Sequence, residues 1–220
     1  MMSKVGMEDA GPADNKTTET GKARRSRLPA EARKAEIVAA TLRLSESHGP
    51  DGLTTEMIAA DIGLTQPALF RHFPKKDMIW TAVAEQLSRD MAAARAASAG
   101  PELAPADCII AIAAAQALMI AKTTGLASIL FSRELHVRNA ELRAGLAKNQ
   151  QALHAELEAA IARGISDGTL RSGISASDAA FLVIAILQGL ALRWSLTGKR
   201  LDLVKEAGRL VRLAVEGFRA

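Results

Sequence analysis

The chain has 220 residues, of which 49% are hydrophobic but only 3% are aromatic, and its formal net charge is +4. Its apolar residues are mainly Ala, Leu, Ile, Val and Met, and no run alternates β-branched with polar residues, which excludes a sheet protein and predicts an all-α fold. The single cysteine, Cys108, excludes an internal disulfide and fits a reducing compartment, so we expect a cytoplasmic protein. The mild basic excess is compatible with nucleic-acid binding but does not establish it.

Residues 1–27 are polar and aperiodic, and they end in the basic run KARRSR at Lys22–Arg27. Such a composition predicts disorder. The run is either a solvated tail or an arm that lies along phosphates or in a minor groove. In the second interpretation Arg24, Arg25 and Arg27 contact DNA.

The chain becomes helical from Pro29, where apolar residues begin to recur three or four apart, and Gly49–Pro50 ends this first helix. A short second helix follows, with Thr54 as its capping hydroxyl and Gly63 as the left-handed residue after its end. Thr65 caps a third helix. Two short helices joined by a glycine-containing turn, preceded by a longer helix, are typical of a helix-turn-helix.

The rest of the chain predicts six further helices and therefore nine in all. We place them at 77–99, 105–122, 125–135, 139–166, 177–197 and 202–218. The two most apolar runs are shorter than a membrane span requires and each contains a glutamine, so we expect buried helices of a soluble protein with no membrane partner.

The last two helices are rich in apolar residues at spacings of three and four, with Gly208 allowing a close approach. They form either intramolecular core or, as we favour, a two-fold helical bundle between subunits. The predicted interface residues are Phe181, Ile184, Gln188, Gly189, Leu192, Val204, Gly208, Val211 and Val215.

The stretch from Gly49 to Ile79, ending TTEMIAADIGLTQPALFRHFPKKDMI, resembles the DNA-binding domain of the TetR family of bacterial transcriptional regulators. The matching positions are Gly49, Thr54, Thr55, Ile58, Ala59, Gly63, Leu64, Thr65, Leu69, Phe70, His72, Phe73, Lys76, Asp77 and Ile79. The resemblance implies nine helices, a homodimer built from the last two, and a ligand cavity among helices four to eight. It places a DNA-binding domain at 28–80, with the helix-turn-helix at about 54–73, and a ligand-binding and dimerisation domain at 81–220.

Two positions depart from the pattern of that family. Phe70 stands where tyrosine is most common, so a hydroxyl contact to a phosphate is lost. Ser45 stands where the first helix usually has a core phenylalanine, so we expect less apolar packing there.

The third helix has two faces with different predicted roles. Leu69 and Phe73 anchor it to the second helix, and its other side faces DNA, where Gln66 suits an adenine edge and Arg71 a guanine edge or a phosphate. For His72 an ordinary surface position is the alternative. The predicted DNA contacts in this region are Thr54, Thr55, Thr65, Gln66, Pro67, Ala68, Phe70, Arg71, His72 and Lys76.

Large or polar residues among small apolar ones are the candidates for a ligand pocket, although each could equally fill the core. They are Met119, Thr123, Phe131, Gln188 and Trp194. No nucleophile with its base, phosphate-binding loop or metal-ligand cluster is present, so we expect neither an enzyme nor a bound cofactor or metal.

The sequence therefore predicts a homodimeric transcriptional regulator that binds double-stranded DNA. We expect a repressor that a small-molecule effector releases from a palindromic operator. The alternative is a DNA-bound dimer without a small ligand that acts through a protein partner.

Overall fold

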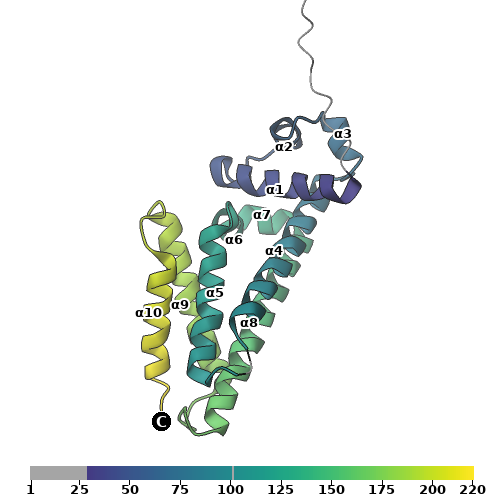
Figure 1. Cartoon of the computed structure of the whole chain (residues 1–220). Coiled ribbons are helices and arrows are strands. Elements are labelled where there is room, and N and C mark those ends of the chain that lie inside the picture. Colours follow the sequence, from purple (N-terminus) through teal and green to yellow (C-terminus); the bar gives the residue numbers. More distant parts are fainter. Residues whose placement is uncertain (1–28, 101) are drawn as a thin grey trace, which may run out of the picture.

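The computed structural model describes residues 29–100 and 102–220, and within these ranges the chain forms ten α-helices and no strand (Figure 1). The all-α prediction is confirmed. The predicted basic arm, with Arg24, Arg25 and Arg27, lies outside the described residues. The N-terminal head contains α1 (Ala30–His48), α2 (Thr55–Asp61) and α3 (Gln66–Phe70). The C-terminal domain contains α4 (Lys76–Ser98), α5 (Pro105–Lys122), α6 (Leu126–Phe131), α7 (Arg133–Arg138), α8 (Ala140–Ser166), α9 (Ala176–Leu196) and α10 (Leu203–Glu216).

One predicted helix, over 125–135, is two helices in the structure. Ser132 ends α6 and begins α7, where its Oγ accepts the Leu135 N–H at 3.1 Å. The same hydroxyl donates to the Asp51 carboxylate, at 2.8 and 2.9 Å to its two oxygens. Because Asp51 lies in the turn after α1, the break in the helix occurs where the C-terminal domain meets the head. Local sequence cannot show this tertiary contact, which is why one helix was predicted over 125–135 where the described chain has two.

The head is a small three-helix unit in which α1 lies across the end of the C-terminal bundle, with α2 and α3 on its far side (Figure 1). Its core contains Ile37, Ile58, Leu69 and Phe73, all buried. Gly63 follows α2 with a φ of 67°, as predicted, and this left-handed residue turns the chain from α2 into α3.

The turn between α5 and α6 lies directly against α1. Gly125 has a φ of 76°, and a Cβ on it would stand 2.1 Å from the Leu42 carbonyl oxygen and 3.2 Å from the Ser45 Cβ. Ser45 itself is fully buried, and its hydroxyl donates to the Thr41 carbonyl at 2.7 Å. The space that a larger side chain would fill at Ser45 is thus taken by the backbone of this turn.

The C-terminal domain is built around α5, which packs against α4, α8, α9 and α10. By length and composition alone, α5 and α9 could each cross a membrane. In the fold, however, α5 is enclosed by four neighbouring helices and α9 packs on α8, α10 and α5. Small residues such as Ala113 and Ala117, both buried, allow the helices to approach α5 closely.

Candidate nucleic-acid interface and internal cavity

The outer side of α3 forms the candidate DNA-binding surface. Leu69 and Phe73 are buried and fix α3 to the head. Capping hydroxyls begin both short helices as predicted: Thr54 accepts the Met57 N–H at 3.2 Å, and Thr65 accepts the Ala68 N–H at 3.4 Å. On the opposite side Thr54, Thr65, Pro67 and Arg71 are exposed, and Gln66, Ala68, Phe70 and His72 are half-buried.

Thr55, a predicted DNA contact, is only 7% exposed in the structure. Its hydroxyl instead accepts a hydrogen bond from Gln66 Nε2 at 2.8 Å, and the same amide nitrogen donates to the Glu56 carboxylate. Thr55 is therefore a residue that positions Gln66. In this state the Gln66 side chain lies against α2 and must leave these partners to reach a base edge.

The structure also reassigns Lys76, which the sequence predicts as a phosphate contact. Lys76 is half-buried, and its Nζ donates to the Leu53 carbonyl oxygen just before α2. Lys76 thereby ties the first turn of α4 to the start of α2. Arg71 and Lys75 are exposed cations beside α3, and their side chains are available to phosphates.

A cavity of about 480 Å³ lies among α4, α5, α6, α8 and α9, and it is partly open to solvent, because exposed residues such as Phe131, Gln188 and Leu192 are among those that line it. Phe131 and Gln188, two of the five predicted pocket residues, line it. Met119, Thr123 and Trp194 are not among the residues that line it. The inward positions of five helices converge here, and sequence spacing within one helix cannot reveal that convergence. Lining residues that the sequence analysis missed include Met91, Gln116, Leu146, Asn149, Gln150 and Leu153.

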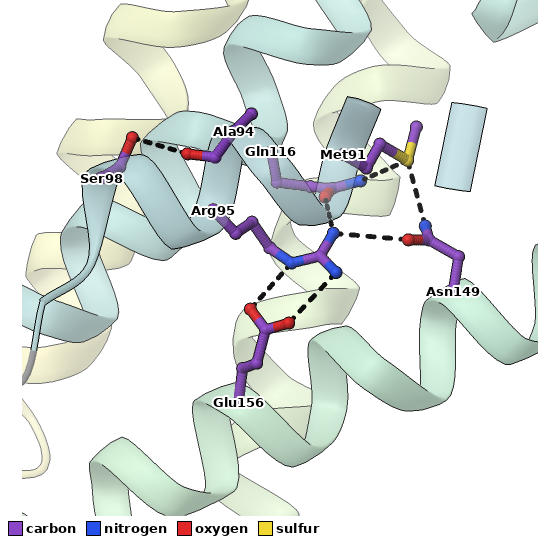
Figure 2. A network of polar contacts seen from close by, with 7 residues as sticks. All are labelled: Met91, Ala94, Arg95, Ser98, Gln116, Asn149 and Glu156. Carbon is purple, nitrogen blue, oxygen red and sulfur yellow. Dashed lines mark hydrogen bonds and ion pairs between the residues drawn. The ribbon is translucent and has the colours of Figure 1, made fainter. Parts of the chain in front are cut away.

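Beside this cavity a buried arginine organises a polar network (Figure 2). Arg95 of α4 is 1% exposed, and its Nε and Nη2 donate to the Glu156 carboxylate at 2.8 and 3.2 Å. Its Nη1 donates to Gln116 Oε1 at 3.2 Å and to Asn149 Oδ1 at 3.4 Å. One signal could have revealed it: Arg95 continues the buried series of Ile79, Val83, Leu87 and Met91 at intervals of four, where a charge requires buried partners.

Polar contacts also join the head to the C-terminal domain. Glu46 of α1 accepts the Gly125 N–H at 3.0 Å and forms an ion pair with Lys199 in the turn between α9 and α10. The hydrogen bond from Lys199, aided by that from Gly125, holds the pKa of the Glu46 carboxyl below its ordinary value. Gly125 stands between Ile120 and Phe131, which both line the cavity. The head therefore contacts a turn whose flanking helices form the cavity wall.

The predicted subunit-interface residues of α9 and α10 differ in how far they are exposed on the single chain. Val211 and Val215 are buried within the single chain, where α10 packs on α5, and Ile184 is buried as well. The apolar side chains of these three residues are thus already covered within the single chain. Of the remaining predicted residues, Val204 and Gly208 are half-buried, and Phe181, Gln188, Gly189 and Leu192 are exposed.

Two family models match the chain. The model for bacterial regulatory proteins of the tetR family matches residues 37–83, and the model for the C-terminal part of the BetI-type transcriptional repressor matches residues 132–219. Among curated proteins, the nucleoid occlusion factor SlmA of Haemophilus ducreyi is 30% identical over 105 residues, which are 48% of this chain and 52% of SlmA. The chain thus spans about half the length of that relative.

Solved structures share the fold over most of the chain. A TetR transcription regulator from Haloarcula marismortui has a TM-score of 0.75 at 17% identity, covering 86% of this chain and all of its own. A TetR-family regulator from Agrobacterium tumefaciens has a TM-score of 0.73 at 20% identity, covering 87% of this chain and 100% of its own. FadR from Bacillus subtilis, in complex with stearoyl-CoA, has a TM-score of 0.71 at 18% identity, covering 84% and 99%.

The head and the larger domain thus match TetR-type models separately, in the order that the fold shows along the chain. The chain belongs to the TetR family and is a DNA-binding transcriptional regulator.

Proposed function

We propose that this regulator is a cytoplasmic homodimeric repressor that leaves a palindromic operator when a small molecule enters the internal cavity. The observation that carries the proposal is the position of Gly125. It is bonded to Glu46 of the head, and the helices on either side of it contribute Ile120 and Phe131 to the cavity wall. FadR, which has the same fold, is in complex with stearoyl-CoA, so a small molecule can occupy this architecture.

Dimerisation would use the exposed apolar side of α9. Phe181 is 60% exposed and Leu196 is 78% exposed, and the exposed residues Ala185, Gly189 and Leu192 lie between them at spacings of three and four. An apolar stripe of this length is costly to leave in water, and a two-fold axis would bury it against the same stripe of a second copy. The revised interface therefore omits Ile184, Val211 and Val215.

DNA recognition would place α3 in the major groove, with the two α3 helices of a dimer entering successive turns on one face of the duplex. Half-sites would then lie about 34–36 Å apart or slightly more. Arg71 would reach a guanine edge or a phosphate. Gln66 would break its hydrogen bonds to Thr55 and Glu56 and form hydrogen bonds to an adenine edge instead. Exposed amides at the start of α3 would add to phosphate binding.

Release would follow from differential binding. A ligand that fits the cavity better when Phe131 or Ile120 shifts would favour a different position of the Gly125 turn and hence of α1. Because the two heads of a dimer must both match the operator, a small tilt at each would lower DNA affinity. The effect is limited to the difference in ligand affinity between the two states.

The dimer and DNA parts are tested together. Purified protein is titrated with duplexes that tile the DNA flanking its own gene, at two salt concentrations, and its mass is measured by sedimentation. We expect a dimer and at least one duplex bound with strong salt dependence. Phe181→Glu should give monomers and lose DNA binding, whereas Leu213→Glu, a matched change at an exposed leucine of α10, should not.

A monomeric wild-type protein at micromolar concentration, or salt-independent binding, would contradict this proposal. The release step is tested by thermal shift over a metabolite panel, with and without the bound duplex. A compound that stabilises the free dimer and releases DNA supports an effector-controlled repressor. A compound that stabilises only the DNA complex would instead make the effector a corepressor.

A further inference from the structure

The polar part of the cavity wall consists of amides. Of the described residues that line it, none is Asp, Glu, Lys, Arg or His. Its polar side chains are Gln116 of α5, Asn149 and Gln150 of α8, and Gln188 of α9. A wall without ionised groups offers no counter-charge to the charged part of a ligand that it buries, so the desolvation of that charge would go uncompensated.

The buried arginine beside the cavity fixes how two of these amides point. A guanidinium carries only donors, so Gln116 and Asn149 must turn their oxygens toward Arg95 and their NH₂ groups away from it. Both NH₂ groups then face the Met91 thioether, at 3.8 Å from Gln116 and 3.0 Å from Asn149 (Figure 2). Thioether sulfur is a weak acceptor, so a carbonyl or hydroxyl oxygen of a ligand could replace it with a gain in binding.

Gln150, the next residue along α8, lacks a hydrogen-bond donor rather than an acceptor. Gln150 Oε1 is buried and has no hydrogen-bond partner within the described part of the chain. A buried amide oxygen without a donor is destabilising for the protein, and a ligand N–H or O–H that reaches it would remove that cost. All three amides belong to residues that line the cavity: the NH₂ groups of Gln116 and Asn149 have only a thioether acceptor, and the oxygen of Gln150 has no donor.

We propose that the effector is an uncharged molecule with an apolar body and a head group that both donates and accepts hydrogen bonds, such as a carboxamide or lactam. This assignment rests on the proposed function, in which the cavity holds the effector. A carboxylate lacks the donor for Gln150, and the nearby cation is not free to balance it because Glu156 already neutralises Arg95 through two hydrogen bonds. An ammonium group finds no anionic partner in the wall and cannot accept from Gln116 and Asn149.

Two sets of compounds with matched bodies test the charge assignment. One is decanamide, decanoate and decylamine, and the other is 4-phenylbutanamide, 4-phenylbutanoate and 4-phenylbutylamine. Calorimetric titration of the full-length protein should show at least one amide binding about tenfold or more tightly than its acid and its amine. An acid or amine that binds as tightly as the amide in both sets, or failure of both amides to bind, would overturn the proposal.

Variants of Gln150 test whether this residue determines the preference for amide ligands. Gln150→Leu should weaken amide binding by about tenfold while leaving the thermal midpoint of the free protein unchanged or higher, because it removes an unpartnered buried oxygen. Gln150→Glu should reverse the preference from the amide to the amine. Gln86→Leu is a matched change on α4 at a glutamine outside the cavity lining. It should alter neither the affinity for the amide nor the preference for the amide over the amine. Unchanged amide affinity in Gln150→Leu would contradict the role of this residue.

DNA binding separates this inference from the proposed function. The same preparations are titrated with the operator duplex, with and without saturating amide. Normal DNA binding together with selectivity for acid or amine overturns the charge assignment and leaves the repressor proposal intact. Loss of salt-dependent DNA binding in the untreated protein overturns the repressor proposal itself. An amide that binds the cavity without releasing DNA contradicts its role as an effector.

Discussion

The backbone N–H of Gly125 donates to Glu46 Oε2 at 3.0 Å, and this hydrogen bond crosses from the C-terminal domain to the head. Lys199 pairs with the same carboxylate from a second turn. One side chain of α1 is thus held by the turn between α5 and α6 and by the turn between α9 and α10. Because α5, α6 and α9 contribute residues to the cavity wall, the contacts of Glu46 are placed to transmit a change there to the head.

Removing the Glu46 carboxylate should uncouple the cavity from the head. In Glu46→Ala both the Gly125 and the Lys199 contacts are lost, which should lower stability by about 1–2 kcal/mol. DNA binding should persist, but its release by an effector should weaken. Fluorescence anisotropy of a labelled operator during effector titration measures this. Glu85→Ala, which removes an exposed pair with Arg89 on α4, is the control and should release normally.

The Glu46 contact should also make stability depend on pH. Its folded-state pKa lies below the ordinary value of 4.5, mainly because Lys199 donates a hydrogen bond to the carboxylate. The stabilisation is therefore fully present above the unfolded-state pKa and is lost as pH falls through the lowered folded-state pKa. Urea unfolding of wild type and Glu46→Gln from about pH 7 down to about pH 3 should show a stability gap that narrows on acidification. A gap of constant size would exclude ionised Glu46 as its source.

Two glycines with nearly equal φ angles allow the cost of backbone strain to be measured separately from the cost of disturbing the packing between the head and the C-terminal domain. Gly125 and Gly168 have φ values of 76° and 79°, but only at Gly125 would a new Cβ overlap a neighbour, the Leu42 carbonyl oxygen. Gly168→Ala should cost about 1 kcal/mol through strain alone. Gly125→Ala should cost about 1–3 kcal/mol more because α1 must move. Equal thermal midpoints for the two variants would show that the turn does not press on α1.

The buried ion pair of Arg95 should be sensitive to the loss of one partner. Glu156→Gln leaves the cation buried with neutral partners and should destabilise the protein by roughly 3 kcal/mol, the lower end for such pairs because Glu156 is 39% exposed. Adding Arg95→Met should restore much of that loss, since no unpaired charge then remains. Denaturant titrations of the two single variants and the double variant measure this. Strictly additive losses would contradict coupling between the two residues.

Gln66 and Lys76 should affect DNA binding differently. Gln66→Ala should relax base preference at one operator position by about 1–3 kcal/mol, because it removes the proposed adenine contact. Binding isotherms on two operator variants measure this, and an equal loss on both would contradict base readout by Gln66.

Lys76→Met is the comparison within the same head. Because Lys76 donates to the Leu53 carbonyl rather than standing free, its loss should lower the stability of the head and leave the salt slope of DNA binding unchanged. If the salt slope of DNA binding fell by about one in this variant, Lys76 would be a phosphate contact after all.

Much of the head could be predicted from the sequence because its determinants are local. The capping hydroxyls of Thr54 and Thr65 act on amides three residues away, and the left-handed Gly63 ends α2 within a single turn. Such signals lie within a few residues of the structure that they specify. The resemblance to the TetR family likewise lies in one continuous stretch, from Gly49 to Ile79. The sequence alone was therefore enough to identify a DNA-binding protein.

The tertiary structure alone decided which surface covers each apolar stripe. The spacing of Val211 and Val215 marks them as buried, but it cannot say whether α5 of the same chain or a second copy buries them. The same ambiguity hid the cavity, the split of α6 from α7 at Ser132, and the pairing of Arg95 with a residue 61 positions away. A helix's period fixes which face is apolar, whereas the partner of that face depends on the free energy of packing the whole chain.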